Sequence, residues 1–145
     1  MLPLAVVLAL SGVIAGPASA ATVTYTADLK AASESPANSS QGTGDVIATL
    51  DTVSNKLSWT VTYSALSGPA TAAHFHGPAM AGANAAPVVP VAAAGLASPM
   101  KGEATLTAAQ AKELADGKWY FNIHTAANAP GEIRGQMMPK IMIKQ

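Results

Sequence analysis

The chain has no cysteine, a single arginine and few charged or aromatic side chains. Of its 145 residues, 11% are charged and 5% are aromatic, and eight Lys and Arg balance eight Asp and Glu. The absence of cysteine excludes disulfides, thiol nucleophiles, zinc–thiolate sites and blue-copper sites. A nucleic-acid-binding protein normally has a basic excess, which this chain lacks, so we expect no nucleic-acid partner. Any metal must be bound by histidine, carboxylate, carbonyl or methionine.

The N-terminal segment is hydrophobic and short. Residues 2 to 15 are almost entirely Leu, Val, Ala, Ile and Gly, and the small-x-small pattern Pro17-Ala18-Ser19-Ala20 follows. A comfortable membrane span needs about 20 apolar residues. We therefore predict a signal peptide over residues 1–20 and a single domain over residues 21–145, periplasmic or secreted, with no membrane span after cleavage. An uncleaved N-terminal anchor is the alternative.

The domain shows the alternation of apolar and polar residues that is typical of strands with one buried face. Val23, Tyr25, Ala27 and Leu29 alternate with polar residues, as do Leu57, Trp59, Val61 and Tyr63. We predict strands over residues 22–29, 46–50, 57–63, 70–75, 88–91, 101–106, 119–124 and 132–137. One short helix is predicted over residues 108–115, where Thr107 and Gln110 form a capping-box pattern and Gly117 is placed to end the helix. This pattern predicts an all-β antiparallel sandwich or barrel.

All three histidines fall in two predicted strands. His74 and His76 are two residues apart, so they project from the same face of a strand, while Phe75 points to the core. In residues 119–124, Trp119, Phe121 and Ile123 form the predicted core face, which leaves Tyr120, Asn122 and His124 on the other. If the two strands are neighbours, a three-histidine metal site forms. In the alternative, the histidines are architectural and hydrogen-bond to loop carbonyls.

Three neutral imidazoles suit copper or zinc, and we predict copper, with zinc as the alternative. Five methionines follow Met1, and Met80 and Met100 are candidates for a further soft ligand. Packing is the alternative role for these methionines. The metal ion is the predicted partner, with another exported protein as a possible second one.

The C-terminal motif runs from Asn128 to Gln136. Pro130-Gly131 predicts a tight turn, and the strand after it places Glu132, Arg134 and Gln136 on one face. Glu132 and Arg134 could pair with each other or with a partner. Arg134 is expected to brace a loop through backbone carbonyls and a carboxylate, or to guide an anion toward the metal. Gly135 is expected to permit close approach of a neighbouring strand.

These motifs together resemble the CHRD domain, the module named after chordin. The resemblance spans residues 22–137 and rests on the His-Phe-His-Gly-Pro segment at 74–78, Tyr-Phe-Asn-Ile-His-Thr at 120–125 and Pro-Gly-Glu-Ile-Arg-Gly-Gln at 130–136. It implies an immunoglobulin-like, antiparallel Greek-key fold in an exported protein. The positions that match the family are His74, His76, Asn122, His124, Glu132 and Arg134. Chordin antagonises growth factors, but the cysteine-rich modules of chordin are missing here.

Three functions remain open. The first prediction is an exported metal-binding protein with a site formed by His74, His76 and His124, and we expect no catalytic residues. Its first alternative is a structural or protein-interaction domain without metal. The second is a redox enzyme, because the His-Phe-His segment is also similar to the copper-binding strand of Cu/Zn superoxide dismutases. The further histidines, the disulfide cysteines and the zinc-site aspartate pattern of that enzyme are missing from this sequence.

Overall fold

A computed structural model describes residues 15, 16 and 21–141. The predicted signal peptide lies outside these residues, apart from Ala15 and Gly16. No helix among the described residues is long and apolar enough to cross a membrane.

Strands make up most of the domain, with one α-helix and two short 3-10 helices. In chain order, the elements are β1 (Thr22–Lys30), η1 (Ala31–Ser33), β2 (Thr43–Asp51), β3 (Lys56–Ser64), β4 (Ala70–His76), β5 (Pro87–Pro90), η2 (Ala93–Gly95), β6 (Met100–Thr105), α1 (Ala108–Ala115), β7 (Tyr120–Thr125), β8 (Ile133–Gln136) and β9 (Met138–Pro139). The eight predicted strands and the predicted helix are all present, with ends that differ by a few residues. The additional strand, β9, is only two residues long.

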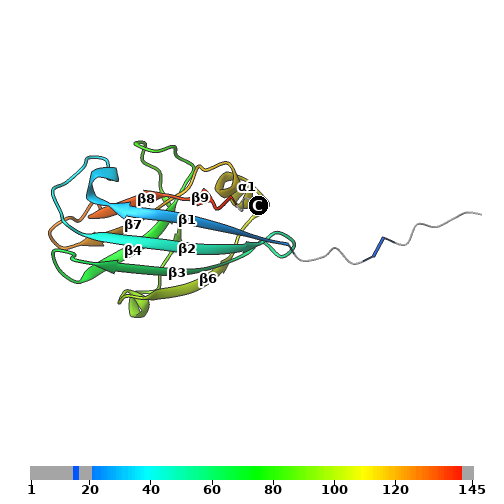
Figure 1. The fold of residues 1–145 in the computed structure, drawn as a ribbon, viewed down its shortest axis with the longest axis horizontal. Coiled ribbons are helices and arrows are strands. Elements are labelled where there is room, and N and C mark those ends of the chain that lie inside the picture. Colours follow the sequence, from blue (N-terminus) through cyan, green and yellow to red (C-terminus); the bar gives the residue numbers. More distant parts are fainter. Residues whose placement is uncertain (1–14, 17–20, 142–145) are drawn as a thin grey trace, which may run out of the picture.

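The strands form one antiparallel sheet that curls into a nearly closed barrel. Their order is β5-β4-β7-β8-β1-β2-β3-β6, and β9 pairs with β1 beside β8. The long strands β1, β2 and β3 pair in chain order. Helix α1 lies at the end of the barrel near the C terminus (Figure 1). Because β4 crosses over to pair with β7 and β6 returns to pair with β3, the topology is not a simple meander. The prediction of an all-β antiparallel fold with one short helix is confirmed.

The hydrophobic core follows the predicted alternation. Tyr25, Ala27 and Leu29 of β1 are buried, as are Leu57, Trp59 and Val61 of β3. Phe75 is fully buried, with ring centroids 5.2 Å from Trp59 and 4.8 Å from Phe121. Phe75 and Phe121 define the inner faces of β4 and β7. Side chains alternate along a strand, so the residues next to each of them in sequence point outward.

Local sequence signals set the ends of α1 and the contact between β1 and β8. Thr107 Oγ1 accepts from the Gln110 N–H at 3.1 Å, and Gln110 Oε1 accepts from the Thr107 N–H at 2.9 Å, which completes the capping box. The helix stops before Gly117, which has φ of +72°. A Cβ on Gly135 would clash with the backbone oxygen of Asp28, so glycine is required for this strand approach, as predicted.

Candidate metal site

Strands β4 and β7 bring the three histidines together. They are antiparallel neighbours in which Ala72 lies opposite His124 and His74 lies opposite Asn122. His124 is therefore the diagonal neighbour of His74, close enough for the two rings to meet. The ring centroid of His74 lies 5.1 Å from that of His124 and 5.5 Å from that of His76. The condition for a three-histidine cluster, that the two strands are neighbours, is therefore met.

The cluster has dimensions that fit a metal ion. One nitrogen from each ring can be chosen so that all three lie within 4.8 Å of one another. His74 Nδ1 and His124 Nε2 are 3.3 Å apart. Two nitrogens that bind one tetrahedral ion at about 2.0–2.1 Å are themselves separated by about 3.3 Å. The pair already has the spacing of two ligands, and His76 supplies the third ring of the cluster.

Backbone carbonyls hold two of the rings in the orientation that metal ligands require. His76 Nδ1 lies 2.9 Å from the Ala85 carbonyl oxygen, and His124 Nδ1 lies 2.8 Å from that of Ala129. A carbonyl can only accept, so both Nδ1 atoms carry the proton and each Nε2 presents its lone pair when the ring is neutral. This outer hydrogen bond accompanies most metal-binding histidines. The proton between His124 and His74 therefore belongs to His74 Nδ1, where a metal would replace it.

His76 Nε2 has a competing partner in Asn122. The Asn122 Oδ1 lies 2.9 Å away, and Asn122 Nδ2 donates to Glu34 Oε1 at 3.4 Å. Only a His76 ring that carries both protons can donate to Ala85 and to Asn122 Oδ1 at once, so the hydrogen bond to Asn122 favours the charged ring. A metal at Nε2 has to displace Asn122 Oδ1. Asn122 thus connects the histidine cluster to Glu34.

The loop residues 83–86, here called the Ala85 loop, are fixed by Tyr120 and Arg134. The Tyr120 hydroxyl lies 3.2 Å from both the nitrogen and the oxygen of Ala85. Arg134 donates to Asn84 Oδ1 at 2.9 Å and to the Ala83 carbonyl. The Tyr120 ring stacks on His76 at 4.6 Å, and the Arg134 guanidinium lies 3.4 Å from the centre of the same tyrosine ring. These contacts position the carbonyl that orients His76.

The surroundings favour neutral imidazoles. Burial lowers the pKa of His74, and the nearby His124 and His76 lower it further. Burial also lowers the pKa of His76, a residue that is 6% exposed, against the opposing effect of its hydrogen bonds to Ala85 and Asn122. Only the neutral ring has a lone pair to offer a metal. At neutral pH, both residues of β4 are therefore neutral, and His74 Nδ1 must give up its proton before it can bind a metal.

Glu132 plays a structural part next to the cluster. It is fully buried and accepts hydrogen bonds from Ser40 Oγ at 2.5 Å, Ser67 N at 2.8 Å, Ser67 Oγ at 2.7 Å and Thr125 Oγ1 at 2.5 Å. Burial raises its pKa, but these hydrogen bonds outweigh that effect and bring the pKa down to about 2. The carboxylate joins two loops to the end of β7. Glu132 and Arg134 do not pair with each other.

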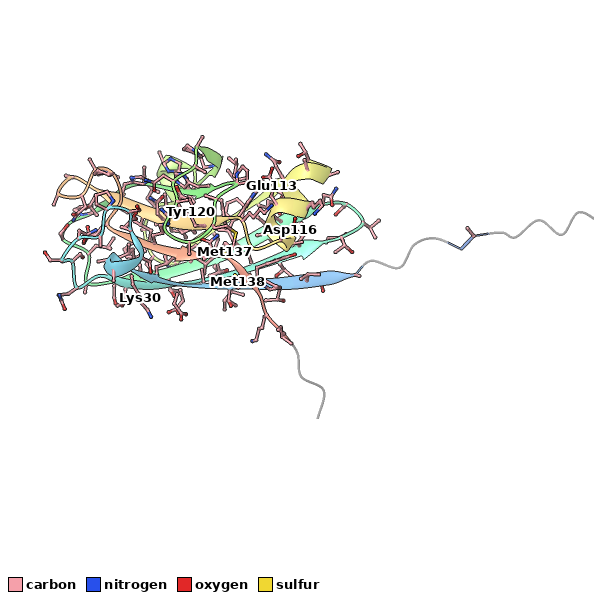
Figure 2. All side chains as sticks on the ribbon, turned by 90° about the horizontal axis from the view of Figure 1, so that it is seen from above. Lys30, Glu113, Asp116, Tyr120, Met137 and Met138 are labelled. Atoms are coloured by element: carbon pink, nitrogen blue, oxygen red, sulfur yellow. The ribbon has the colours of Figure 1, made fainter. Side chains whose placement is uncertain are left out.

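The methionines divide into core and surface residues. Met100 and Met137 are fully buried in the hydrophobic core, which agrees with a packing role. Met80 is 59% exposed and Met138 is 51% exposed. The consecutive residues Met137 and Met138 are both labelled in Figure 2, and the first is buried whereas the second is half exposed. Met142 lies outside the described residues.

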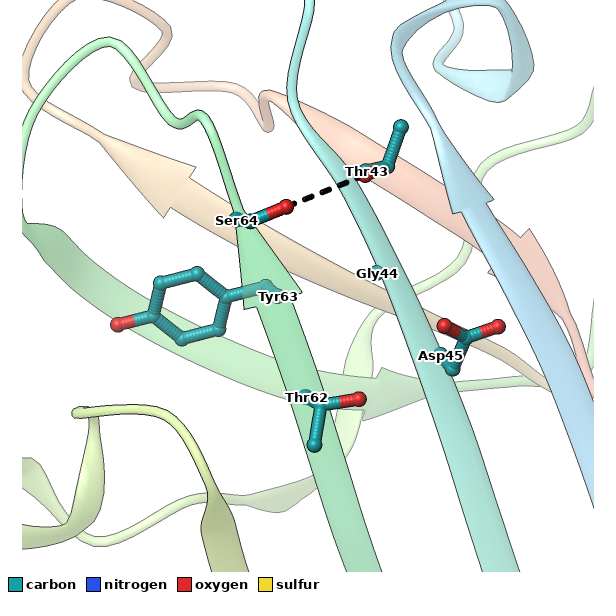
Figure 3. A pocket seen from close by; sticks show the side chains of 6 residues that line it. All are labelled: Thr43, Gly44, Asp45, Thr62, Tyr63 and Ser64. Atoms are coloured by element: carbon teal, nitrogen blue, oxygen red, sulfur yellow. Dashed lines mark hydrogen bonds between the residues drawn. The ribbon is translucent and has the colours of Figure 1, made fainter.

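A second feature of the surface is a cavity of about 250 Å³ over the ends of β2 and β3 (Figure 3). Thr43, Asp45, Thr62, Tyr63 and Ser64 line it with Gly44, and the Thr43 and Ser64 hydroxyls are 3.5 Å apart across the strands. No histidine lines this cavity, and Asp45 is its only charged residue. It has no part in the candidate metal site.

Sequence reasoning placed the histidines but missed their supporting residues. Glu34 and the Ala85 loop come from segments without periodicity, and only the folded chain brings them to Asn122 and His76. The sole available signal for Glu34 was a single acidic residue in a loop rich in serine and alanine. For Arg134, the prediction of loop bracing through carbonyls is confirmed, but its second acceptor is the Asn84 amide instead of a carboxylate.

Comparison with known proteins identifies the family. No match to the chain was found among curated proteins or among solved structures. The family model described as the CHRD domain matches residues 25–137. This match includes all three histidines, the Ala85 loop and the C-terminal motif with Glu132 and Arg134. The chain therefore belongs to the CHRD domain family.

Proposed function

We propose that this protein is an exported metal-binding protein that holds one copper ion through His74, His76 and His124. The observation that carries the proposal is the convergence of three imidazoles whose ligand nitrogens lie within 4.8 Å of one another. The carbonyls of Ala85 and Ala129 supply the outer hydrogen bonds of a metal site. Export rests on the hydrophobic segment and cleavage pattern of residues 2–20, and protein purified from its own cells should begin at Ala21.

The preference for copper follows from the ligand chemistry. Imidazoles suit both copper and zinc, but a given nitrogen site binds Cu²⁺ more tightly than Zn²⁺. Among the described residues, no carboxylate belongs to the cluster, so the three neutral ligands leave the full charge of the ion uncompensated. Cu(I) carries less charge than Zn²⁺ and is therefore easier to accommodate in this half-buried place.

A titration tests the proposal. Metal-free protein should take up one equivalent of Cu(I) or Cu²⁺ per chain, and zinc should compete only weakly. His76→Ala should abolish stoichiometric binding. Asp45→Asn, which alters an exposed carboxylate on another part of the surface, is the matched control and should bind like the wild type. Unchanged stoichiometry in His76→Ala would remove the site.

A structural role without metal is the second candidate, and a specific observation favours it. Each histidine ring already has a hydrogen-bond partner, because Ala85, Ala129 and the His74–His124 contact occupy the three Nδ1 atoms. In that case, His76→Ala would lower stability in metal-free protein, and neither copper nor zinc would raise the melting temperature of the wild type. A metal-dependent rise in melting temperature that the variant lacks favours the metal site.

A further inference from the structure

A second polar site lies on the side of Asn122 that faces away from His76. A cavity of about 420 Å³ there is lined by Ser33, Glu34, Ser35, Arg134 and Gln136, and the rest of its wall is alanine and glycine. None of the three histidines lines it. Its volume falls in the range of about 300–1,000 Å³ that is usual for small-molecule sites. Short side chains make up most of the wall, so a small polar molecule fits it better than an apolar one.

Arg134 is buried in this wall and forms no ion pair with a carboxylate of the described residues. Its side chain is only 2% exposed, and it makes two hydrogen bonds, to Asn84 and to Ala83. A guanidinium has five N–H donors. Within the described part of the chain, ion pairs join Lys56 to Glu103 and Lys112 to Asp116, and none includes Arg134. Buried charges are normally paired because desolvation is costly.

Glu34 is the opposite group in the same wall. It is 8% exposed and accepts a single side-chain hydrogen bond, the long one of 3.4 Å from Asn122. An ionised carboxylate has room for about four. Burial raises the pKa of Glu34 to about 7, although Asn122, Arg134 and the Ser35 N–H act in the other direction. Gly131 leaves the space that this side chain needs, because a Cβ there would clash with Glu34 and Asn122.

Two groups of opposite charge therefore share one cavity, stay apart, and retain unused hydrogen-bonding capacity. Gln136 adds an acceptor, because its Nε2 already donates to Ala79 and Gly117, while its Oε1 has no hydrogen-bond partner among the described residues. An anion without a positive group would be repelled by the Glu34 carboxylate, and a cation without a negative group would be repelled by Arg134. A molecule with one charge of each sign matches both groups.

We propose that this cavity binds a small zwitterion of the α-amino-acid class, with its carboxylate on Arg134 and its ammonium on Glu34 and Gln136. The carboxylate accepts the guanidinium donors that the protein leaves unused. The ammonium donates to the Glu34 carboxylate and to Gln136 Oε1. This site is separate from the histidine cluster, so binding does not require a metal.

The test is a nuclear magnetic resonance titration of the ¹⁵N-labelled chain at about pH 8 in the presence of a chelator, with L-serine as the probe. We expect saturable shifts of the Ser33, Glu34, Ser35 and Gln136 amides with a Kd below about 1 mM. Acetate and methylamine each carry one of the two charges, and each should bind at least tenfold more weakly.

Variants assign the binding to the cavity. Glu34→Gln keeps the shape of the side chain but removes its charge, and should weaken L-serine at least tenfold. Glu103→Gln, an exposed carboxylate on β6, is the matched control and should bind like the wild type. Absence of saturable shifts, or acetate that binds as tightly as L-serine, would overturn the proposal. Equal affinity in Glu34→Gln and the wild type would do the same.

Discussion

Two buried glutamates, Glu34 and Glu132, behave in opposite ways. Glu132 accepts four hydrogen bonds and its pKa falls to about 2, whereas Glu34 accepts one long side-chain hydrogen bond and its pKa rises to about 7. Both side chains are less than a tenth exposed. The difference therefore comes from the number of donors that the fold supplies to each carboxylate.

This contrast separates two kinds of polar interior in one small domain. Around Glu132, every oxygen is satisfied by the protein, so the group serves the architecture and joins loops that are distant in sequence. Around Glu34 and the histidines, some hydrogen-bond donors and acceptors have no partner among the described residues. A metal, a proton or a small molecule can bind at such groups when they are buried.

The largest effect on stability is expected at the satisfied carboxylate. Glu132→Ala leaves Ser40, Ser67 and Thr125 facing an empty space, so the free energy of unfolding should fall by about 4 kcal/mol at pH 7. Glu132→Gln keeps the shape and should lose about half as much. Urea unfolding followed by tryptophan fluorescence measures both. A loss of less than about 1 kcal/mol in Glu132→Ala would show that the four hydrogen bonds do not anchor the loops.

The free energy of unfolding of the wild type should depend on the protonation of Glu132 at acid pH. The pKa of Glu132 is about 2 in the folded state and 4.5 in its usual state, so its contribution is complete above pH 4.5 and is lost as the pH falls toward 2. The expected loss is about 3 kcal/mol. Unfolding free energies between about pH 5 and pH 2 should fall more steeply in the wild type than in Glu132→Gln. Parallel profiles would contradict the low pKa.

Glu34 should give a change of the opposite sign. The pKa of Glu34 is raised from 4.5 to about 7 in the folded state, so the folded protein binds this proton more tightly than the unfolded chain does. The resulting stabilisation is complete below pH 4.5 and is lost as the pH rises through 7. Glu34→Gln avoids the buried charge, and should be more stable than the wild type by up to about 3 kcal/mol at about pH 8. Below about pH 4.5 the difference should vanish. A variant that is less stable at pH 8 would place Glu34 among the satisfied groups.

The smallest effect is expected from the group that supports the Ala85 loop. Tyr120→Phe keeps the ring on His76 but removes the hydroxyl that contacts Ala85, so copper affinity should fall by about three- to tenfold. Competition against a chelator of known affinity measures this change, while urea unfolding should show a loss of about 1 kcal/mol or less. Unchanged copper affinity would mean that the Ala85 carbonyl orients His76 without help from Tyr120.

Sequence reasoning succeeded where a short-range pattern determines the structure. Alternation identified the strands and the inner faces of β4 and β7, and with them the direction in which His74, His76 and His124 point. Spacing of Thr107, Gln110 and Gly117 fixed both ends of α1. In each case, the deciding contacts lie within a few residues or follow from the period of a strand.

The residues that the sequence did not reveal depend on contacts between distant loops. Glu34 is hydrogen-bonded to Asn122, which lies 88 residues away in sequence, and Ser40 is hydrogen-bonded to Glu132, which lies 92 residues away. The outward face of β7 and β8 was expected to be polar, but Asn122 and Arg134 on it are buried under loops. No local pattern encodes which loop covers which strand. The sequence therefore allowed for loop carbonyls as partners of the histidines, but it could not identify Ala85 and Ala129 or the Glu34 cavity.

X-ray absorption at the copper edge tests the central claim most directly. Protein loaded with one equivalent of copper should show the scattering of three imidazoles around the metal, and His124→Ala loaded in the same way should show two. A first shell dominated by oxygen or sulfur, or the same number of imidazoles in the wild type and in His124→Ala, would contradict a site built from His74, His76 and His124.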